Sequence, residues 1–275
     1  MAEKFFKYHG LGNDFVILDR RAGGQDVDAE LARQLCDRHR GVGADGVLVL
    51  TAATQGLARM IIHNADGSLP EMCGNGIRCA AKYLVDHQRE KPDQIEIETD
   101  LGPILCRLHY SGGLVDEVEV AMGAAKLVDS QLPSGQTGAP FLEQELPGFP
   151  GLKGSAVSLG NPHLVLFAQT LEAIEQLGPR LEGHPLFPQK TNVELVKQTG
   201  SGLALRVWER GVGLTEACGT GACAAAAAAV ALGKAPSSEW LKVELPGGAL
   251  RIKVEPALNS VLMRGPATFV FEGYL

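Results

Sequence analysis

Two glycine-rich segments that begin with cysteine are so alike that they indicate an internal duplication of the chain. The first reads CGNGIRCAA from Cys73, and the second reads CGTGACAA from Cys218. An earlier Gly-Asn pair precedes each of them, at 12–13 and at 160–161. The two cysteines lie 145 positions apart (218 minus 73), and the two Gly-Asn pairs lie 148 apart (160 minus 12). Because these separations nearly agree, the sequence indicates two homologous halves in series.

Each half has the pattern of an α+β unit with one central apolar helix. Strand-like runs follow both Gly-Asn pairs, FVILD in the first half and LVLFA in the second. Nine positions before the two cysteines stand Asn64 and Glu209. We therefore expect two pseudo-symmetric domains, 1–119 and 120–262, with more strand than helix. Helices are expected at 28–38, from Cys73 to about 87, at 171–178, and from Cys218 to about 232.

Composition and charge exclude several classes of partner. The chain has 275 residues, of which 45% are hydrophobic and 21% charged, as in an average globular protein. Its formal net charge is -7 and no Lys/Arg-rich run is present, which argues against nucleic acid or an anionic membrane as a partner. The start MAEKFFKYHG lacks a signal-peptide pattern, so we expect a cytoplasmic protein whose six cysteines are reduced.

A cysteine beside Gly-x-Gly, directly before an apolar helix, is placed where free backbone N–H groups and the helix dipole converge. Such a position binds anions and stabilises a thiolate, so the sequence predicts lowered pKa values for Cys73 and Cys218. Either segment alone would more often be a helix start with a buried cysteine. The other four cysteines, Cys36, Cys79, Cys106 and Cys223, are interpreted as small apolar residues of helices and strands.

Two thiols on opposite sides of one carbon atom would solve a particular chemical problem. Inverting a stereocentre by proton transfer requires a base on one face and an acid on the other. A thiolate and a thiol can do both, with the roles exchanged in the reverse direction, and their apparent pKa values belong to the pair. The residues do not say which of the two is ionised at rest. This chemistry requires no cofactor, and the cysteine spacings do not favour a metal site.

The assembled motifs resemble those of the diaminopimelate epimerase family over nearly the whole chain. They are HGLGNDF (9–15), NADGS (64–68), CGNG (73–76), GNPH (160–163), TNVE (191–194) and ERGVGLTEACGTGAC (209–223). The resemblance implies a cofactor-independent isomerase that interconverts LL- and meso-diaminopimelate in lysine biosynthesis. It also implies two domains with strongly curved, mostly antiparallel sheets around a central helix, the last strand (263–275) returning to the first domain, and a homodimer.

Residue roles follow from the same resemblance. Cys73 and Cys218 would be the acid and base, and the amides of Gly74, Asn75, Gly219 and Thr220 would bind the reacting carboxylate. The distal amino-acid end of the substrate would be bound by a polar set: Asn13, Asn64, Asn161, Asn192, Glu209 and Arg210. His163 and Glu209 match positions associated with tuning the thiol pKa values. Gly46 departs from those members of the family that have a substrate-contacting glutamine there.

Two other functions are compatible with the same cysteines. One is a racemase or isomerase of another small carboxylate, such as proline, on the same scaffold. The other is a redox or zinc-binding protein that uses the cysteines as a disulfide or a metal site. Turnover of diaminopimelate in the presence of reductant distinguishes the epimerase from both.

Overall fold

The chain folds into two units, and each has the same succession of paired strands. The computed structural model describes residues 2–70, 73–86, 88, 90–135 and 138–275. Unit 1 comprises the described residues up to Ala121 together with Arg264–Leu275, and unit 2 comprises Met122–Met263. The unit boundaries fall inside two strands, β7 (Leu114–Gly123) and β16 (Val261–Pro266). The domain boundary expected between 119 and 120 also falls inside β7.

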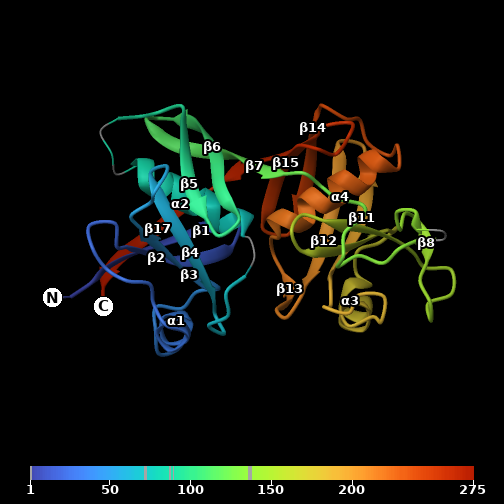
Figure 1. Ribbon diagram of the computed structural model, residues 1–275, viewed down its shortest axis with the longest axis horizontal. Helices are drawn as coiled ribbons and strands as arrows, with labels where there is room; N and C mark the ends of the chain where they lie inside the picture. The colour runs from blue at the N-terminus through green and yellow to red at the C-terminus, as the bar shows by residue number, and fades with distance from the viewer. Residues whose placement is uncertain (1, 71–72, 87, 89, 136–137) are drawn as a thin grey trace. The chain divides into compact units, whose positions relative to one another are not determined.

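The sheet of unit 1 begins with the last strand of the chain. Strand β17 pairs with β1, and the sheet then continues in chain order from β1 to β7 (Figure 1). The pairs β2–β3 and β4–β5 are parallel, and the others are antiparallel. The strands are β1 (Lys4–Gly10), β2 (Asn13–Asp19), β3 (Gly46–Thr51), β4 (Ala58–Asn64), β5 (Gln94–Thr99), β6 (Gly102–Ser111) and β17 (Thr268–Tyr274).

The sheet of unit 2 repeats this pattern. The pairs β9–β10 and β11–β12 are antiparallel, whereas β10–β11 and β12–β14 are parallel. The pairs of unit 1 from β1–β2 to β4–β5 alternate in the same way. Strand β13 makes a short extra pairing with β12, and β8 pairs with β9. The strands are β8 (Gln144–Glu145), β9 (Lys153–Ser158), β10 (Pro162–Phe167), β11 (Asn192–Thr199), β12 (Gly202–Glu209), β13 (Gly213–Thr215), β14 (Trp240–Leu245) and β15 (Gly248–Val254).

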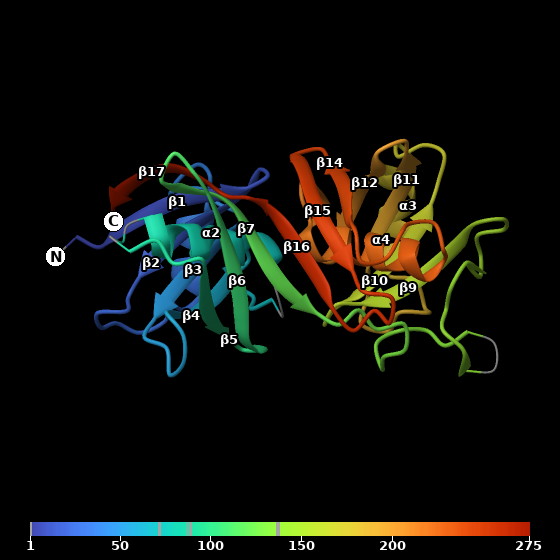
Figure 2. The same cartoon turned by 90° about the horizontal axis from the view of Figure 1, so that it is seen from above.

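One helix lies inside the sheet of each unit. Helix α2 (Gly74–Asp86) contacts β1 to β6 and β17, and helix α4 (Gly219–Ala231) contacts β9 to β12, β14 and β15 (Figure 2). Every residue of α4 from Gly219 to Ala229 is buried. A helix buried on all sides must be apolar on all sides, and alanine methyl groups let the strands approach its axis closely. The run of alanines is thus explained by packing.

Two shorter helices cover the outer faces of the sheets. Helix α1 (Ala29–Cys36) begins at Asp28, whose side chain accepts the N–H of Leu31, close to the expected start. It buries its apolar face against β2 and β3. The end of α2 expected at about 87 lies outside the described residues, and α4 ends with Leu232 as its C-cap, as expected.

The boundaries expected for the third helix are wrong. Helix α3 spans Ile174–Glu182 rather than 171–178. Gly178 does not end the helix, because its role is close packing: a Cβ there would lie 2.6 Å from the Trp208 ring. The expected fold class is confirmed, since each unit has a mixed, mostly antiparallel sheet around a central helix. Among the described helices, none is long and apolar enough to cross a membrane.

Candidate active site

Both predicted catalytic cysteines lie at the start of a buried helix. The N–H of Gly76 donates to the sulfur of Cys73 over 3.3 Å, and the N–H of Gly221 donates to the sulfur of Cys218 over the same distance. In both cases the donor is the third residue after the cysteine, so the sulfur acts as the N-terminal cap of α2 or α4. The predicted local geometry is therefore present in each unit.

Cys218 is only 5% exposed, and it is surrounded by acceptors and carboxyl groups. Burial raises its pKa well above the ordinary thiol value, and the charges of Glu209 and Glu194 raise it further. The hydroxyl of Thr220 and the N–H of Gly221 act in the opposite direction but do not outweigh burial. The predicted lowering of the pKa is thus wrong for Cys218. The helix end is favourable to a thiolate, but loss of water from the sulfur is the larger effect.

Glu209 lies at the end of β12 and faces this thiol. Its carboxyl group accepts a 2.6 Å hydrogen bond from the hydroxyl of Thr215 and a further one from Cys218. Burial nevertheless raises the pKa of Glu209 above its usual range. A buried carboxyl group with a raised pKa, hydrogen-bonded to a thiol, is the kind of pair that is found at functional sites.

His163 is completely buried near the start of β10, and both of its ring nitrogens have partners. Its Nδ1 lies 2.6 Å from Oε1 of Glu194, and its Nε2 lies 2.9 Å from Oδ1 of Asn161. The residue after Asn-Pro therefore belongs to a buried polar network rather than to a turn. Glu194, the last residue of the TNVE motif, was not among the predicted site residues, although its motif was recognised.

Asn192 connects two other predicted site segments of unit 2. Its side-chain N–H donates to the carbonyl of Pro162, and its Oδ1 accepts the backbone N–H of Arg210. The guanidinium of Arg210 lies 3.5 Å from the carbonyl of Gln189. Asn192 thus fixes the strand end that carries both Glu209 and Arg210.

In unit 1, Cys73 is half-buried and lines a small pocket of about 20 Å³. Asn75, at the start of α2, donates through its side-chain amide to Oδ1 of Asn13 over 3.0 Å. The amide of Asn13 in turn donates to Oδ2 of Asp45 over 3.0 Å. The structure therefore brings Asn13 and Asn75 together beside the helix start, with their amides oriented by a carboxylate.

Asp45 belongs to a charged cluster that holds the beginning of β2. Arg38 forms ion pairs with Asp45 (2.6 Å) and with Asp14 (2.7 Å), and Lys7 forms one with Asp14 (2.6 Å). Burial opposes ionisation of Asp14, but hydrogen bonds from Arg38 and Lys7 outweigh it and hold its pKa well below its usual range. A carboxylate that stays ionised keeps this segment in one conformation.

Asn64 ends β4, the strand equivalent to β12, and it closes the NADGS turn. Its side-chain amide donates to the hydroxyl of Ser68 over 2.9 Å, and its backbone N–H donates to the carbonyl of Ser68. Asp66 accepts from both the N–H and the hydroxyl of Ser68. The turn therefore fixes the position of the Asn64 side chain.

Gly46 leaves little space for a side chain. A Cβ at this position would lie 2.6 Å from the carbonyl oxygen of His63 on the neighbouring strand. A larger residue would require β3 and β4 to move apart. The packing of these two strands therefore accounts for a glycine at this position.

The remaining thiols behave as buried apolar residues. Burial raises the pKa of Cys36 to about 11 and the pKa values of Cys79 and Cys106 to about 12. Within the part of the chain that the structure describes, no group of three or more histidine, cysteine or acidic side chains is arranged to hold a metal ion.

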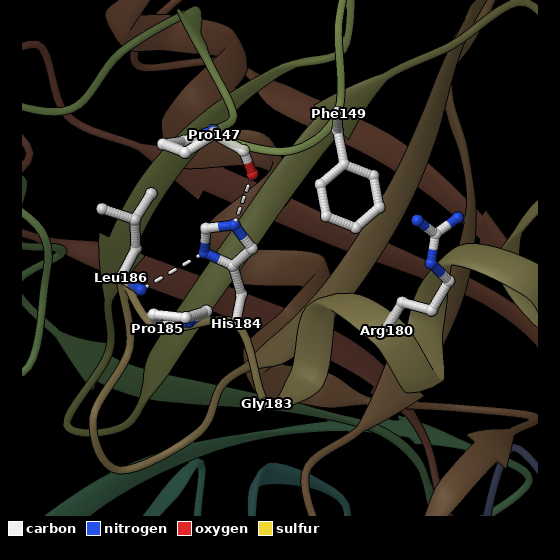
Figure 3. Close-up of a pocket in the computed structure, with 7 residues that line it drawn as sticks. All are labelled: Pro147, Phe149, Arg180, Gly183, His184, Pro185 and Leu186. Atoms are coloured by element: carbon white, nitrogen blue, oxygen red, sulfur yellow. Dashed lines mark hydrogen bonds between the residues drawn. The ribbon is translucent and has the colours of Figure 1, made fainter.

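A larger pocket, of about 600 Å³, lies beside α3 in unit 2 (Figure 3). Both ring nitrogens of His184 are used within the protein, one with the carbonyl of Pro147 and the other with the N–H of Leu186. Arg180 stacks over the ring of Phe149 at 4.5 Å. The walls of this larger pocket are mostly apolar and include none of the predicted site residues. The size of the pocket therefore does not make it the reaction site.

Comparison with known proteins identifies the family. The diaminopimelate epimerase family model matches residues 5–128 and 155–270. A diaminopimelate epimerase of Moorella thermoacetica is 44% identical over 275 residues, which cover 98% of each chain. A diaminopimelate epimerase of Desulfitobacterium hafniense is 44% identical over 98% of this chain and 96% of its own.

The chain belongs to the diaminopimelate epimerase family.

Diaminopimelate epimerases are isomerases that interconvert LL- and meso-diaminopimelate in lysine biosynthesis, so the predicted family and enzyme class are confirmed. Solved structures of other families share the fold. A PhzF-family phenazine biosynthesis protein of Bacillus anthracis has a TM-score of 0.75 at 17% identity, covering 100% of this chain and 99% of its own. A probable proline racemase from Agrobacterium radiobacter has a TM-score of 0.73 at 15% identity, covering 99% and 92%.

Several polar residues of the candidate site were not among the predicted site residues. Asp45, Thr215 and Glu194 contact predicted site residues, and Arg38 contacts Asp45, so each acts through a neighbour. Glu194 stood inside a recognised motif, and Asp45 stood beside Gly46, so position in the motifs was the available signal. The hydrogen bonds that give these residues their roles join strands that are distant in sequence, and no local pattern encodes them.

Proposed function

We propose that this chain interconverts LL- and meso-diaminopimelate by a two-base mechanism, without a cofactor, with Cys73 and Cys218 as the acid and base. The observation that carries the proposal is the shared geometry of the two sulfurs, each of which caps a buried helix and accepts an N–H at 3.3 Å. Two equivalent thiols on a duplicated scaffold are what inversion of one carbon centre requires.

In this mechanism, a thiolate takes the proton from the α-carbon, and the thiol of the other cysteine gives its own proton to the opposite face. The sulfur that began as thiolate ends as thiol, and the other ends as thiolate, so protons balance in each turnover. Because burial raises the pKa of Cys218, we propose that this residue is the thiol in the resting enzyme. The apparent pKa values measured in turnover then belong to the pair.

An α-proton beside a carboxylate is a weak acid, so developing charge on that carboxylate must be stabilised in the transition state. Backbone N–H groups at a helix start are suited to this, because they are oriented before the substrate arrives. We assign this role to the amides of Gly74 and Asn75 in α2 and of Gly219 and Thr220 in α4. Their glycine-rich setting lets a carboxylate approach closely.

The distal amino-acid end must be bound without reacting. Its carboxylate needs a cation and its ammonium needs acceptors, which the guanidinium of Arg210, the carboxyl group of Glu209 and amide oxygens provide. The ordered amides described above support this assignment, since each has a fixed partner. We assign distal recognition to Asn13, Asn64, Asn161, Asn192, Glu209 and Arg210, and assign tuning of the thiol pKa values to His163 and Glu209.

We also propose that the two units are homologous domains and that the chain forms a homodimer in the cytoplasm. Strand β17 supports the dimer, because several of its apolar side chains are exposed: Phe269, Val270, Phe271 and Tyr274 are 42%, 49%, 44% and 68% exposed. Burial of exposed apolar side chains against a second copy is favourable. Sedimentation equilibrium tests the dimer, and Phe271→Asp should shift it to monomer; a wild-type monomer would contradict the proposal.

Incubation with LL-diaminopimelate in deuterated water and a thiol reductant tests the reaction. We expect the meso isomer, carrying solvent deuterium at one α-carbon, without pyridoxal phosphate. Cys73→Ala and Cys218→Ala should each abolish turnover, whereas Cys106→Ala, a matched change at a buried thiol outside the site, should retain it. Turnover of proline with no turnover of diaminopimelate would replace this function with the racemase alternative.

A further inference from the structure

The two units differ at one equivalent place in their cores. In unit 1, Phe15 on β2 pairs with Gly46 at the start of β3, and Leu48 lies two residues after Gly46. In unit 2, His163 on β10 pairs with Asn192 at the start of β11, and Glu194 lies two residues after Asn192. An aromatic and an aliphatic side chain in one unit are thus replaced by a histidine and a carboxyl group in the other.

This place lies directly beside the catalytic helix. A Cβ added to Gly221 in α4 would lie 2.9 Å from Oε1 of Glu194 and 3.2 Å from the sulfur of Cys218. Because both distances start from one point, the carboxyl oxygen and the sulfur are at most about 6 Å apart, within the range where one charge alters the pKa of another. Glu194 is therefore close to the reacting sulfur, although it carries none of the predicted functions.

In unit 1 the equivalent side chain beside the helix start is apolar. A Cβ added to Gly76 in α2 would lie 3.1 Å from Cδ2 of Leu48 and 3.4 Å from the sulfur of Cys73. The fold therefore accepts a leucine at this position without a buried charge. Burying a carboxyl group costs free energy that an apolar residue avoids, so packing alone does not explain Glu194.

The hydrogen bonds of His163 define how many protons this network holds. Asn161 Oδ1 can only accept, so the ring donates through Nε2. A second proton then lies between Nδ1 and Oε1 of Glu194, which are 2.6 Å apart. Its two possible locations, on the ring or on the carboxyl group, both leave the pair with no net charge.

The other carboxyl oxygen indicates where that proton rests. Among the described residues, Oε2 of Glu194 is buried and has no hydrogen-bond partner. A bare carboxylate would leave this oxygen charged and unsatisfied, whereas a carboxylic acid places less charge on it. Burial also raises the pKa of Glu194, in the same direction. The proton can still move to the ring, because the hydrogen bond is short.

We propose that Glu194 is a positioning residue of the epimerase reaction, which fixes the ring of His163 and shares a single proton with it beside Cys218. This inference rests on the proposed function of Cys218. At the equivalent positions beside Cys73, unit 1 has Phe15 and Leu48 instead. The two cysteines therefore work in different electrostatic surroundings on a duplicated scaffold.

The titratable groups linked to Cys218 come from three strands: Glu209 and Glu194 act on its pKa, and His163 lies at hydrogen-bond distance from Glu194. Glu209 is on β12, Glu194 is on β11 and His163 is on β10. The charge of Glu194 is one of the influences that raise the pKa of Cys218, after burial and Glu209. Replacing Glu194 by a neutral group removes the negative charge that it carries whenever the shared proton is on the ring of His163. Ionisation of Cys218 should therefore shift to lower pH, while Glu209 continues to oppose it.

The central test compares Glu194→Gln with Glu119→Gln. Glutamine retains the shape and can donate to Nδ1, but it cannot hold the shared proton. Glu119 is a matched control, since it is also buried beside a histidine, His109, at 3.5 Å. For Glu194→Gln we expect kcat to fall about tenfold or more with KM changed less than about twofold, and the Cys218 alkylation profile to move to lower pH. Glu119→Gln should match the wild type in all three.

A second variant keeps the test decisive if Glu194→Gln fails to fold. The double change His163→Phe with Glu194→Leu introduces the pair that unit 1 already uses, so it should fold, with a wild-type far-UV spectrum and a much lower kcat. Should neither variant fold, ¹⁵N NMR of His163 in the wild type decides. A protonated Nε2 with a shared proton at Nδ1 supports the proposal, and a ring with an ordinary unprotonated Nδ1 overturns it.

The outcomes separate this inference from the proposed function. Wild-type kcat, KM and alkylation profile in Glu194→Gln would overturn the role of Glu194, and so would a rise in KM at unchanged kcat. If the wild type itself failed to turn over diaminopimelate, the proposed function would fail. The Cys218 alkylation profile and the His163 spectrum would still test the shared proton in that case.

Discussion

The hydroxyl of Thr215 donates a 2.6 Å hydrogen bond to Oε1 of Glu209, the carboxyl group that also accepts from Cys218. Burial raises the pKa of Glu209, and these two hydrogen bonds lower it. Thr215→Val removes one of them, so the pKa of Glu209 should rise further. A neutral hydrogen bond contributes about 1 kcal/mol, which corresponds to slightly less than one pKa unit.

The acidic limb of the kcat/KM profile of Thr215→Val should therefore move to higher pH by roughly half a unit to one unit. The measurement is a pH series of initial rates with saturating reductant. Thr199→Val, which removes a turn hydroxyl elsewhere in unit 2, serves as the control and should leave the limb in place. An unchanged limb in Thr215→Val would show that Glu209 does not titrate in the assay.

Gly221 is expected to tolerate no side chain. Alanine normally stabilises a helix interior relative to glycine by about 1 kcal/mol. In Gly221→Ala the new methyl group would meet both Glu194 and the sulfur of Cys218, at 2.9 and 3.2 Å, so one of them must move. We expect kcat to fall by about a hundredfold, since small displacements of reacting groups have effects of that size. Gly183→Ala, with nothing within 4 Å of its added Cβ, should retain wild-type activity.

Asp45 accepts a hydrogen bond from Asn13, to which we assign distal recognition, so its replacement should affect binding more than chemistry. In Asp45→Asn, the acceptor for the Asn13 amide loses its charge and the ion pair with Arg38 is lost. We expect KM to rise about tenfold with a smaller change in kcat, consistent with loss of a charge-assisted hydrogen bond. Steady-state kinetics beside the exposed change Asp116→Asn gives the comparison. A fall in kcat alone would assign Asp45 to the chemical step instead.

Alkylation should distinguish the thiols in the native protein. Cys73 is half-buried, whereas the other five cysteines are buried, and burial raises the pKa values of Cys36, Cys79 and Cys106 to between about 11 and 12. At about pH 8, iodoacetamide should modify Cys73 first, with loss of activity in step with one label per chain. Peptide mass spectrometry identifies the site. Early labelling of any other cysteine would contradict the accessibility described here.

Much of the fold was predictable because the chain contains its pattern twice. The duplicated cysteine segments located α2 and α4, and the two Gly-Asn pairs located β2 and β10. Internal repetition removes much of the ambiguity of a single local pattern. The boundaries of α3 were not predictable, because Gly178 reads locally as a helix end and only its contact with Trp208 explains it.

The site shows the same division between local and distant information. The helix-start position of both cysteines follows from adjacent residues, and it was predicted. The raised pKa of Cys218 was not, because it depends on burial and on Glu209 and Glu194, which come from other strands. Local sequence encodes the helix dipole that favours a thiolate, but it does not encode how much water reaches the sulfur.

The pairing of β17 with β1 has a consequence for synthesis of the chain on the ribosome. Unit 2 is continuous, so all of its strands leave the exit tunnel before β17 does. Unit 1 receives its last strand only when translation of residues 268–274 is finished. The later half of the duplication can therefore fold first, and the earlier half must keep one side of β1 uncovered until the end, which is when chaperones would be most needed.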